Sequence, residues 1–215
     1  GNVSLRYVDS VGDLHQPDMI ILPGTKSTIA DLRWLRQCGL EAAIHKAADA
    51  GTLVFGVCGG YQMLGRTVSD PEQVEAAGTT EILGMGLLEM DTIFLGEKVQ
   101  AQTTGVFAGI SGVLSDLNGM SYSGYEIHMG RSEEEMPALA GTGNVYGSYV
   151  HGVFDASGIS DTILKALCVR KGIDFDALET FDISEYKEHQ YDLLADAVRS
   201  GLDMEFIYRI LNREV

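Results

Sequence analysis

Short apolar runs separated by amphipathic stretches fill the first third of the chain. Residues 3–8 alternate apolar and polar side chains, whereas Met19–Leu22 and residues 52–57 are apolar runs of strand length. All three segments predict strands, and the last predicts a buried one. Apolar side chains recur at helical spacing in residues 28–37 and 40–48, which predicts two helices between the second and third strands. Continuous apolar strands that alternate with helices are typical of a mostly parallel sheet covered on both faces. The pattern therefore predicts an α/β fold.

The middle of the chain has a different pattern. Residues 82–150 are rich in Gly, Thr, Ser and Tyr. Their strand-like runs lie at 86–94, 98–107, 122–128 and 144–150. We expect several of these strands to pair in antiparallel fashion at one side of the sheet. Helical spacing returns at 163–169 and from Glu185 onward, with a last amphipathic helix at Met204–Leu211. We therefore expect one α/β domain over residues 1–215, with antiparallel additions in its middle.

Charge and composition exclude several classes of function. The formal net charge is −16, which argues against binding to nucleic acid and to anionic membranes, because both need a basic surface. No apolar run approaches the ~20 residues of a membrane span, and no signal segment opens the chain. The three cysteines are odd in number and widely spaced, without CxxC pairs or a His/Cys cluster at zinc spacing. We therefore expect a cytoplasmic, reduced protein without a metal site.

The segment GVCGG at residues 56–60 carries the main chemical signal. An apolar strand enters it, Cys58 occupies a tight turn between glycines, and a helix leaves, which is the arrangement of a nucleophile elbow. Such a turn exposes its side chain at the carboxyl end of the sheet. We expect the helix N-terminus near Gly60 to lower the thiol pKa and the Gly59 N–H to face a developing oxyanion. The alternative is that Cys58 is a small buried apolar residue, but its glycine setting favours a functional role.

Three further motifs accompany GVCGGYQMLG at residues 56–65. They are ILPGTKST at 21–28, GYEIHMGR at 124–131 and GSYVHGVFD at 147–155. Together the four resemble the class I, or triad-type, glutamine amidotransferase domain of the cobyric acid synthase family. The PGTKST form separates the chain from the sister cobyrinic acid a,c-diamide synthases, which have a glycine-rich run there. The resemblance covers nearly the whole chain and implies the class I glutamine amidotransferase fold, with a flavodoxin-like sheet.

The resemblance also implies a function. Members of the family amidate four carboxylates of adenosylcobyrinic acid a,c-diamide in cobalamin biosynthesis, with ammonia from glutamine and with ATP activating each carboxylate. The chain is then the glutaminase half. Its partners are glutamine, an N-terminal synthetase domain of the same parent chain, and the corrinoid acceptor bound through that domain. ATP and Mg belong to the synthetase domain, which this chain lacks, so no cofactor is expected here. Members usually begin the domain with one further strand, which we expect to be missing.

Five residues receive roles by resemblance. Cys58 is the nucleophile that forms a thioester with glutamine, and His151 is the base paired with it. Gly24, at the end of the second apolar run, and Gly59 would supply the oxyanion hole. Gln62 matches the glutamine of the nucleophile motif and would help to hold the substrate.

The third member of a catalytic triad is not specified by the sequence. Triad amidotransferases usually carry Glu two residues after the histidine, but here that position is Val153. Asp155 and Glu126 are candidates, and a Cys–His dyad is equally possible. His128 lies in the GYEIH motif, where it could line the glutamine pocket or be a structural histidine.

Two other classes of protein are alternatives to the amidotransferase interpretation. Cysteine hydrolases of the PfpI type also carry Cys at an elbow, but they place an activating Glu near the first strands and are not expected to have PGTKST or GYEIH motifs. A non-catalytic binding module would more naturally lack the cysteine or the histidine, and both are present. An inactive fragment is the remaining alternative.

Overall fold

The computed structural model describes most of the chain in two units. The described residues are 3–75, 78, 81–132, 137–156, 158–178 and 183–214. The first unit is Gly1–Leu178 and the second is Glu179–Val215. The first unit holds both sheets, and the second holds two helices.

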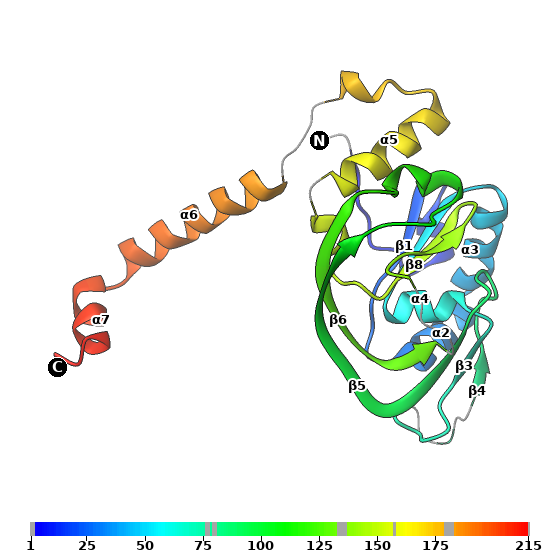
Figure 1. The fold of residues 1–215 in the computed structure, drawn as a ribbon, viewed down its shortest axis with the longest axis horizontal. Coiled ribbons are helices and arrows are strands. Elements are labelled where there is room, and N and C mark those ends of the chain that lie inside the picture. The colour runs from blue at the N-terminus through cyan, green and yellow to red at the C-terminus, as the bar shows by residue number, and fades with distance from the viewer. Residues whose placement is uncertain are drawn as a thin grey trace. The chain divides into compact units, whose positions relative to one another are not determined.

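The first sheet has four strands in the order β1-β2-β8-β7, of which β1 and β8 are labelled in Figure 1. They are β1 (Met19–Leu22), β2 (Leu53–Val57), β8 (Val145–Ser148) and β7 (Ala140–Thr142). The strands β1, β2 and β8 are parallel, and β7 runs antiparallel to β8. At the carboxyl end of the sheet, Leu22 lies opposite Gly56, and Gly56 lies opposite Gly147. The mostly parallel α/β sheet predicted from the apolar runs is confirmed.

Helices cover both faces of this sheet. On one face pack α2 (Thr28–Gln37) and α3 (Leu40–Asp49), whose apolar side chains form a core cluster with Val54 of β2. On the other face pack α5 (Ile159–Lys171) and the 3-10 helix η1 (Gly112–Leu117), in a cluster with Leu53 and Phe55 of β2. Successive residues of a strand point to opposite faces, so β2 supplies both cores. The remaining short elements are α1 (Val11–Leu14), α4 (Gly59–Leu64), η2 (Val153–Asp155) and η3 (Phe175–Ala177).

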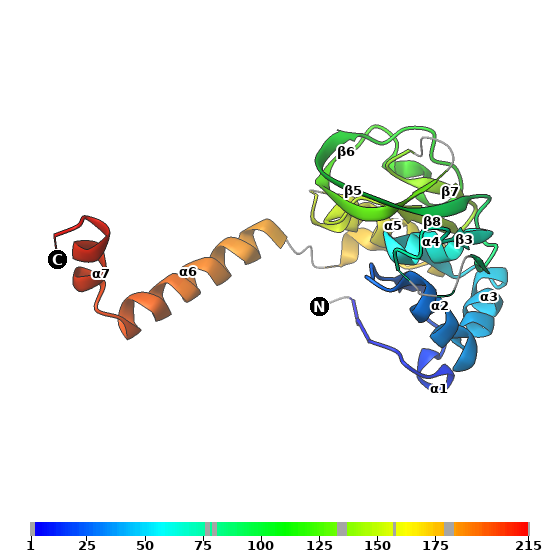
Figure 2. The same ribbon diagram turned by 90° about the horizontal axis from the view of Figure 1, so that it is seen from below.

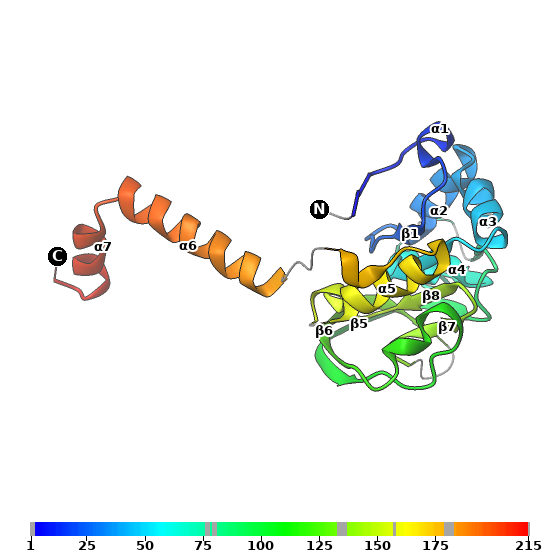
Figure 3. The same cartoon turned by 90° about the horizontal axis from the view of Figure 1, so that it is seen from above.

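The second sheet has the order β4-β3-β5-β6. It consists of β4 (Glu81–Leu83), β3 (Thr67–Ser69), β5 (Asp91–Val106) and β6 (Ser121–Ser132). The long strands β5 and β6 form an antiparallel ribbon with a register shift between Phe94 and Val99. Figures 2 and 3 show this ribbon on the side of the first unit opposite α1 and α3. The predicted antiparallel strands are present, but β5 and β6 belong to a separate sheet, because β7 already occupies the flank of β8 in the first.

Two strand predictions were wrong in part. Residues 3–8 run outside any strand of the described chain, and Val3, Leu5 and Tyr7 are exposed. An alternating apolar pattern forms a strand only beside a hydrogen-bonding neighbour, and β1 pairs with β2 alone among the described strands. The run predicted at 86–94 becomes a strand only at Asp91, because Gly86 adopts a positive φ of 66° and the chain bends at residues 87–89.

The second unit consists of α6 (Ile183–Gly201) and α7 (Met204–Leu211), as the helical spacing predicted. Asp203 caps α7, because its carboxylate accepts a hydrogen bond of 2.9 Å from the Phe206 N–H. Within the described ranges, no helix combines the length and apolarity that a membrane span requires.

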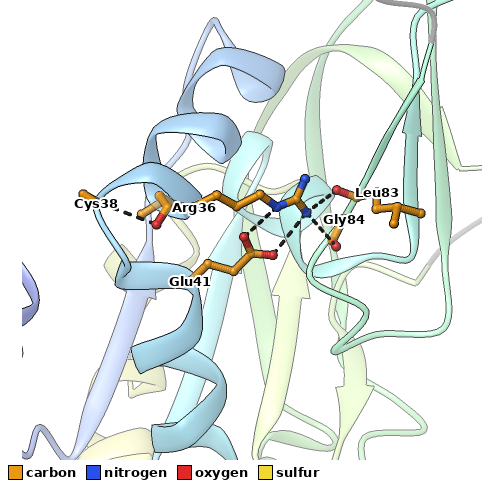
Figure 4. Close-up of polar contacts among 6 residues, drawn as sticks. Arg36, Cys38, Glu41, Leu83 and Gly84 are labelled. Carbon is orange, nitrogen blue, oxygen red and sulfur yellow. Dashed lines mark hydrogen bonds and ion pairs between the residues drawn. The ribbon is translucent and has the colours of Figure 1, made fainter.

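One arginine links the helices of the first sheet to the second sheet (Figure 4). Arg36 of α2 donates from Nε to Glu41 of α3 at 2.6 Å and from Nη2 at 3.1 Å. The same Nη2 donates to the carbonyl oxygens of Leu83 and Gly84, at the end of β4. Charge-assisted, bidentate contacts of this kind are among the stronger hydrogen bonds in proteins. Arg36 therefore fixes the position of β4 against α2 and α3.

The substitution Arg36→Ala is expected to lower the free energy of unfolding by about 1–2 kcal/mol, because it removes hydrogen bonds from a charged group that is only one-third exposed. Denaturant unfolding followed by circular dichroism measures the change. Lys171→Ala is the matched control, since the pair of Lys171 with Asp18 is half-exposed on both sides, and its loss should change the stability by less than about 1 kcal/mol. Equal effects of the two substitutions would contradict the linking role of Arg36.

Candidate active site

The backbone of Cys58 has an unusual conformation between β2 and α4. Its φ is 50° and its ψ is −110°, in a region that non-glycine residues rarely occupy. Two hydrogen bonds hold it there, one of 2.8 Å from the Cys58 N–H to the Ser148 carbonyl and one of 3.0 Å from the Gln62 N–H to the Cys58 carbonyl. The strand, tight turn and helix predicted around Cys58 are therefore present. The side chain itself is buried, with 5% of its surface exposed.

Glycines allow the elbow to pack closely against its neighbours. A Cβ on Gly60 would lie 2.1 Å from the carbonyl oxygen of Leu22, and a Cβ on Gly56 would lie 2.6 Å from Cα of Tyr61. Both distances are far below van der Waals contact. Any larger residue at either position would push α4 away from the sheet and move Cys58 with it.

His151 and Gly24 lie beside Cys58. His151 follows β8, and its backbone forms an isolated bridge with Tyr125 of β6. A Cβ built on Gly24 would lie 3.0 Å from Cε1 of His151 and 3.5 Å from Cβ of Cys58. Gly24 thus lies next to both side chains, at the carboxyl end of β1. The fold brings together three residues that are separated by up to 127 positions in the sequence, the interval from Gly24 to His151.

Gly59 and Gln62 occupy the first turn of α4. The backbone N–H of Gly59 forms a hydrogen bond with the Cys58 sulfur, which favours the thiolate. The Gln62 side chain is buried, and its Oε1 accepts a hydrogen bond of 3.2 Å from the Thr28 hydroxyl of α2. Its Nε2 has no hydrogen-bond partner among the described residues. Buried amide groups rarely remain unpaired, so this nitrogen is unusual among the described buried atoms.

The electrostatic environment of Cys58 differs from the expectation. Burial raises the pKa of the Cys58 thiol, the hydrogen bond from Gly59 lowers it, and the negative charges of Glu126 and Glu75 raise it further. The Gly59 N–H at the start of α4 lowers the pKa as predicted, but the pKa is raised overall. The reason is that desolvation of the thiolate outweighs the favourable field of a helix of one and a half turns. The thiol proton faces the Ile127 carbonyl of β6, 3.6 Å from the sulfur.

The pKa of His151 is lowered, first by burial and then by the neighbouring His128. A raised thiol pKa and a lowered imidazole pKa favour the same resting state, in which both groups are neutral. A neutral imidazole is the form that accepts a proton. His151 is therefore in the form that a general base requires, while the Cys58 thiol contacts the Ile127 carbonyl.

The acidic candidates for a third member lie in different environments. Glu126 contacts His128, with 3.3 Å between Oε2 and Nε2, and the His128 ring stacks on Tyr149 at 4.2 Å between centroids. Asp155 closes the 3-10 turn η2 through a 2.9 Å hydrogen bond from its N–H to the Gly152 carbonyl. Val153, two residues after the histidine, is buried in the core of the first sheet. Among the described residues, no group of three or more His, Cys, Asp or Glu side chains could hold a metal ion.

Glu75 is a site residue that sequence reasoning missed. Its carboxylate accepts hydrogen bonds of 2.8 Å from the backbone N–H groups of Thr28 and Ile29, and it thereby caps α2. Ser27 stands at the N-cap position but makes no side-chain cap hydrogen bond. Glu75 lies more than 40 residues away in the sequence and belongs to none of the four motifs, so no local signal could have identified it.

The pH dependence of Cys58 alkylation tests these charges. The thiolate is the reactive form, so the rate with iodoacetamide should rise with a midpoint above the ordinary thiol pKa of about 8.5. Glu126→Gln removes one charge that raises the pKa, and the midpoint should therefore move to lower pH. Peptide mapping by mass spectrometry follows Cys58 separately from Cys38 and Cys168.

Glu89→Gln is the control for this experiment, since the Glu89 side chain is 90% exposed and Glu89 is not among the groups that shift the Cys58 pKa. It should leave the midpoint unchanged. A midpoint that stays in place or rises in Glu126→Gln would show that the carboxylate charge does not act on the sulfur.

Comparison with known proteins agrees with the motifs and the fold. Residues 1–159 match the CobB/CobQ-like glutamine amidotransferase domain. Cobyric acid synthase of Lachnoclostridium phytofermentans is 49% identical over an alignment of 239 residues, gaps included. The alignment covers 100% of this chain and 46% of that protein. Cobyric acid synthase of Ruminiclostridium cellulolyticum is 44% identical over an alignment of 231 residues, which covers 99% of this chain and 45% of that protein. The chain thus spans about half the length of the curated relatives it matches.

A solved structure described as a glutamine amidotransferase superposes with a TM-score of 0.53 and 18% sequence identity. The superposition covers 80% of this chain and 88% of the chain in that structure. This similarity confirms the amidotransferase fold. Family membership also favours the amidotransferase interpretation over a PfpI-type hydrolase. The chain belongs to the family of CobB/CobQ-like glutamine amidotransferase domains.

Proposed function

We propose that this chain is the glutaminase part of a cobyric acid synthase, in which Cys58 takes the side-chain nitrogen from glutamine as ammonia. The observation that carries the proposal is the elbow at Cys58, a cysteine held at φ 50° beside His151 and Gly24. The curated relatives that match the whole chain carry the name cobyric acid synthase, which supports this branch of the family.

In the first half of the reaction, a neutral thiol meets a neutral imidazole. The Cys58 proton passes to a ring nitrogen of His151 as the sulfur attacks the side-chain amide carbon of glutamine. A carbon–sulfur bond forms, and the carbonyl π electrons move to oxygen. The Gly59 N–H and the loop that contains Gly24 would stabilise this oxyanion. Gln62 would orient the substrate through its unpaired amide nitrogen.

In the second half, the imidazolium returns its proton to the substrate nitrogen. The carbon–nitrogen bond breaks, ammonia leaves, and a thioester remains on Cys58. Water then attacks the thioester with His151 as the base, glutamate leaves, and the thiol is regenerated. One glutamine and one water thus give one glutamate and one ammonia. No metal or cofactor takes part in these steps.

Ammonia would be consumed outside this chain. The chain spans about half the length of its relatives, so the parent protein has room for a synthetase domain. We place there the ATP- and Mg-dependent activation of the carboxylates of adenosylcobyrinic acid a,c-diamide. The activated carboxyl carbons are the electrophiles of that reaction, and ammonia is its nucleophile. The corrinoid would contact this chain only through that domain.

The glutamine analogue 6-diazo-5-oxo-norleucine tests the glutaminase site. A single adduct on Cys58 is expected, protected by excess glutamine. His151→Ala should slow labelling by about 100-fold or more, because loss of a general base costs roughly 10²–10⁴ in rate. His45→Ala is the matched control, since His45 lies in α3 outside the four motifs, and it should label at the normal rate. Intact-mass time courses and peptide mapping give the rates.

If the analogue fails to label Cys58 while iodoacetamide still does, the thiol is accessible but no glutamine site is formed. That result would overturn the proposal for this chain and support the inactive-fragment alternative. Labelling of His151→Ala at the normal rate would instead support Cys58 as the nucleophile and contradict the role of His151 as the base.

Gly24→Ala probes the space between the two side chains. The new methyl group would lie 3.0 Å from Cε1 of His151 and 3.5 Å from Cβ of Cys58, so it should displace the imidazole. We expect labelling by the analogue to slow by at least ~10-fold, because small misplacements of reacting groups reduce rates strongly. Gly12→Ala has only an ordinary contact of 3.8 Å and should label normally. Normal labelling of Gly24→Ala would contradict the arrangement.

A further inference from the structure

The ring of Tyr125 lies flat on the ring of His151. Their centroids are 5.1 Å apart and their planes differ by only 6°. Tyr125 comes from β6 in the second sheet, whereas His151 follows β8 in the first. The contact therefore joins the two sheets at the candidate base. The Tyr125 side chain is about half-exposed, so its role is not explained by filling a core.

The backbones of the same two residues are also joined. The His151 N–H donates to the Tyr125 carbonyl at 2.8 Å, and the Tyr125 N–H donates to the His151 carbonyl at 3.2 Å. Gly124 permits this approach, because a Cβ there would lie 2.2 Å from the His151 carbonyl oxygen. Two backbone hydrogen bonds fix the Cα positions, and the stacked rings fix how the side chains project from them. Together they leave the imidazole little freedom to turn.

Two positions from which a carboxylate could orient His151 are occupied in other ways. The position two residues after the histidine is Val153, which is buried in the core. Glu126, the neighbour of Tyr125, contacts His128 instead. A stacked ring also differs from a carboxylate partner in its chemistry. It restrains the plane of the imidazole but occupies neither ring nitrogen, so both remain free for proton transfer.

We propose that Tyr125 is a positioning residue that holds the imidazole plane of His151 for proton transfer with Cys58, in the role that a carboxylate fills in triad enzymes. This inference rests on the proposed function, in which His151 is the base. The aromatic face of Tyr125 restrains the imidazole plane, and the hydroxyl group is not needed for this role. Phenylalanine should therefore replace tyrosine, while leucine or threonine should not.

The test compares Tyr125→Phe, Tyr125→Leu and Tyr125→Thr with the unmodified chain. Threonine suits an exposed strand position, so it provides a folded variant should the leucine variant fail to fold. Tyr122→Leu is the matched control. Tyr122 lies three residues away on the same strand and stacks on Phe107 at 4.8 Å, so it reports the loss of a stacked tyrosine away from the site.

Two measurements are made on each variant. Labelling of Cys58 by 6-diazo-5-oxo-norleucine, at a series of concentrations, separates the maximal rate from the half-saturating concentration. In Tyr125→Leu and Tyr125→Thr the maximal rate should fall by roughly 10- to 100-fold, and the half-saturating concentration should stay within about 2-fold, as expected when only transition-state interactions are lost. In NMR spectra, the His151 ring protons should lose the upfield ring-current shift that Tyr125 causes. Tyr125→Phe and Tyr122→Leu should retain both the rate and the shift.

Three results would overturn the inference. They are an unchanged maximal rate in Tyr125→Leu and Tyr125→Thr, an equal loss in Tyr125→Phe, or an equal loss in Tyr122→Leu. Failure of the proposed function looks different. In that case the unmodified chain gains no adduct on Cys58. If only the Tyr125 inference fails, the unmodified chain is labelled, and Tyr125→Leu and Tyr125→Thr are labelled at the same rate.

Discussion

The close packing of α4 on the carboxyl ends of β1 and β2 is the constraint on which the site depends. A cysteine at φ 50° stores strain of about 1–3 kcal/mol, and surrounding contacts must hold it in place. They do so because Gly60 allows the helix to touch the Leu22 carbonyl and Gly56 lets Tyr61 lie on β2. The same packing aligns the Gly59 N–H with the sulfur. The glycines therefore set the direction of the nucleophile as well as the distance between helix and sheet.

Burial then decides the protonation state of the site. The field of α4 favours a thiolate, but desolvation and the carboxylates of Glu126 and Glu75 act against it. Desolvation also keeps His151 neutral. A thiolate–imidazolium pair has two charges to desolvate, whereas the neutral pair has none. Burial therefore favours the neutral forms of both side chains.

Local signals in the sequence were sufficient for β1, β2 and the helices between them, and for the elbow at Cys58. The strand β7 was not predicted, and the run that forms β8 was grouped with strands of which several were expected to be antiparallel. The strand at Met19–Leu22 and the helices α2 and α3 follow from uninterrupted apolar runs and periodic spacing, and the GVCGG segment predicts the elbow. Long-range relations were not predictable. Residues 3–8 have the alternation of a strand but no neighbour to pair with, and the ribbon of β5 and β6 was expected in the first sheet. The raised thiol pKa also depends on β6 lying over Cys58, which no local pattern encodes.

The second sheet is part of the site and not an addition to it. Ile127 of β6 faces the thiol, and Tyr125, two residues earlier on the same strand, pairs with His151 through backbone and ring. One stretch of β6 therefore contacts both Cys58 and His151, through the Ile127 carbonyl and through Tyr125. A shift of β6 relative to β8 must therefore move the thiol contact and the imidazole together. At the far edge of the same sheet, Arg36 joins β4 to α2 and α3, so the sheet that carries Tyr125 is fastened to the helices that cover the sheet of Cys58.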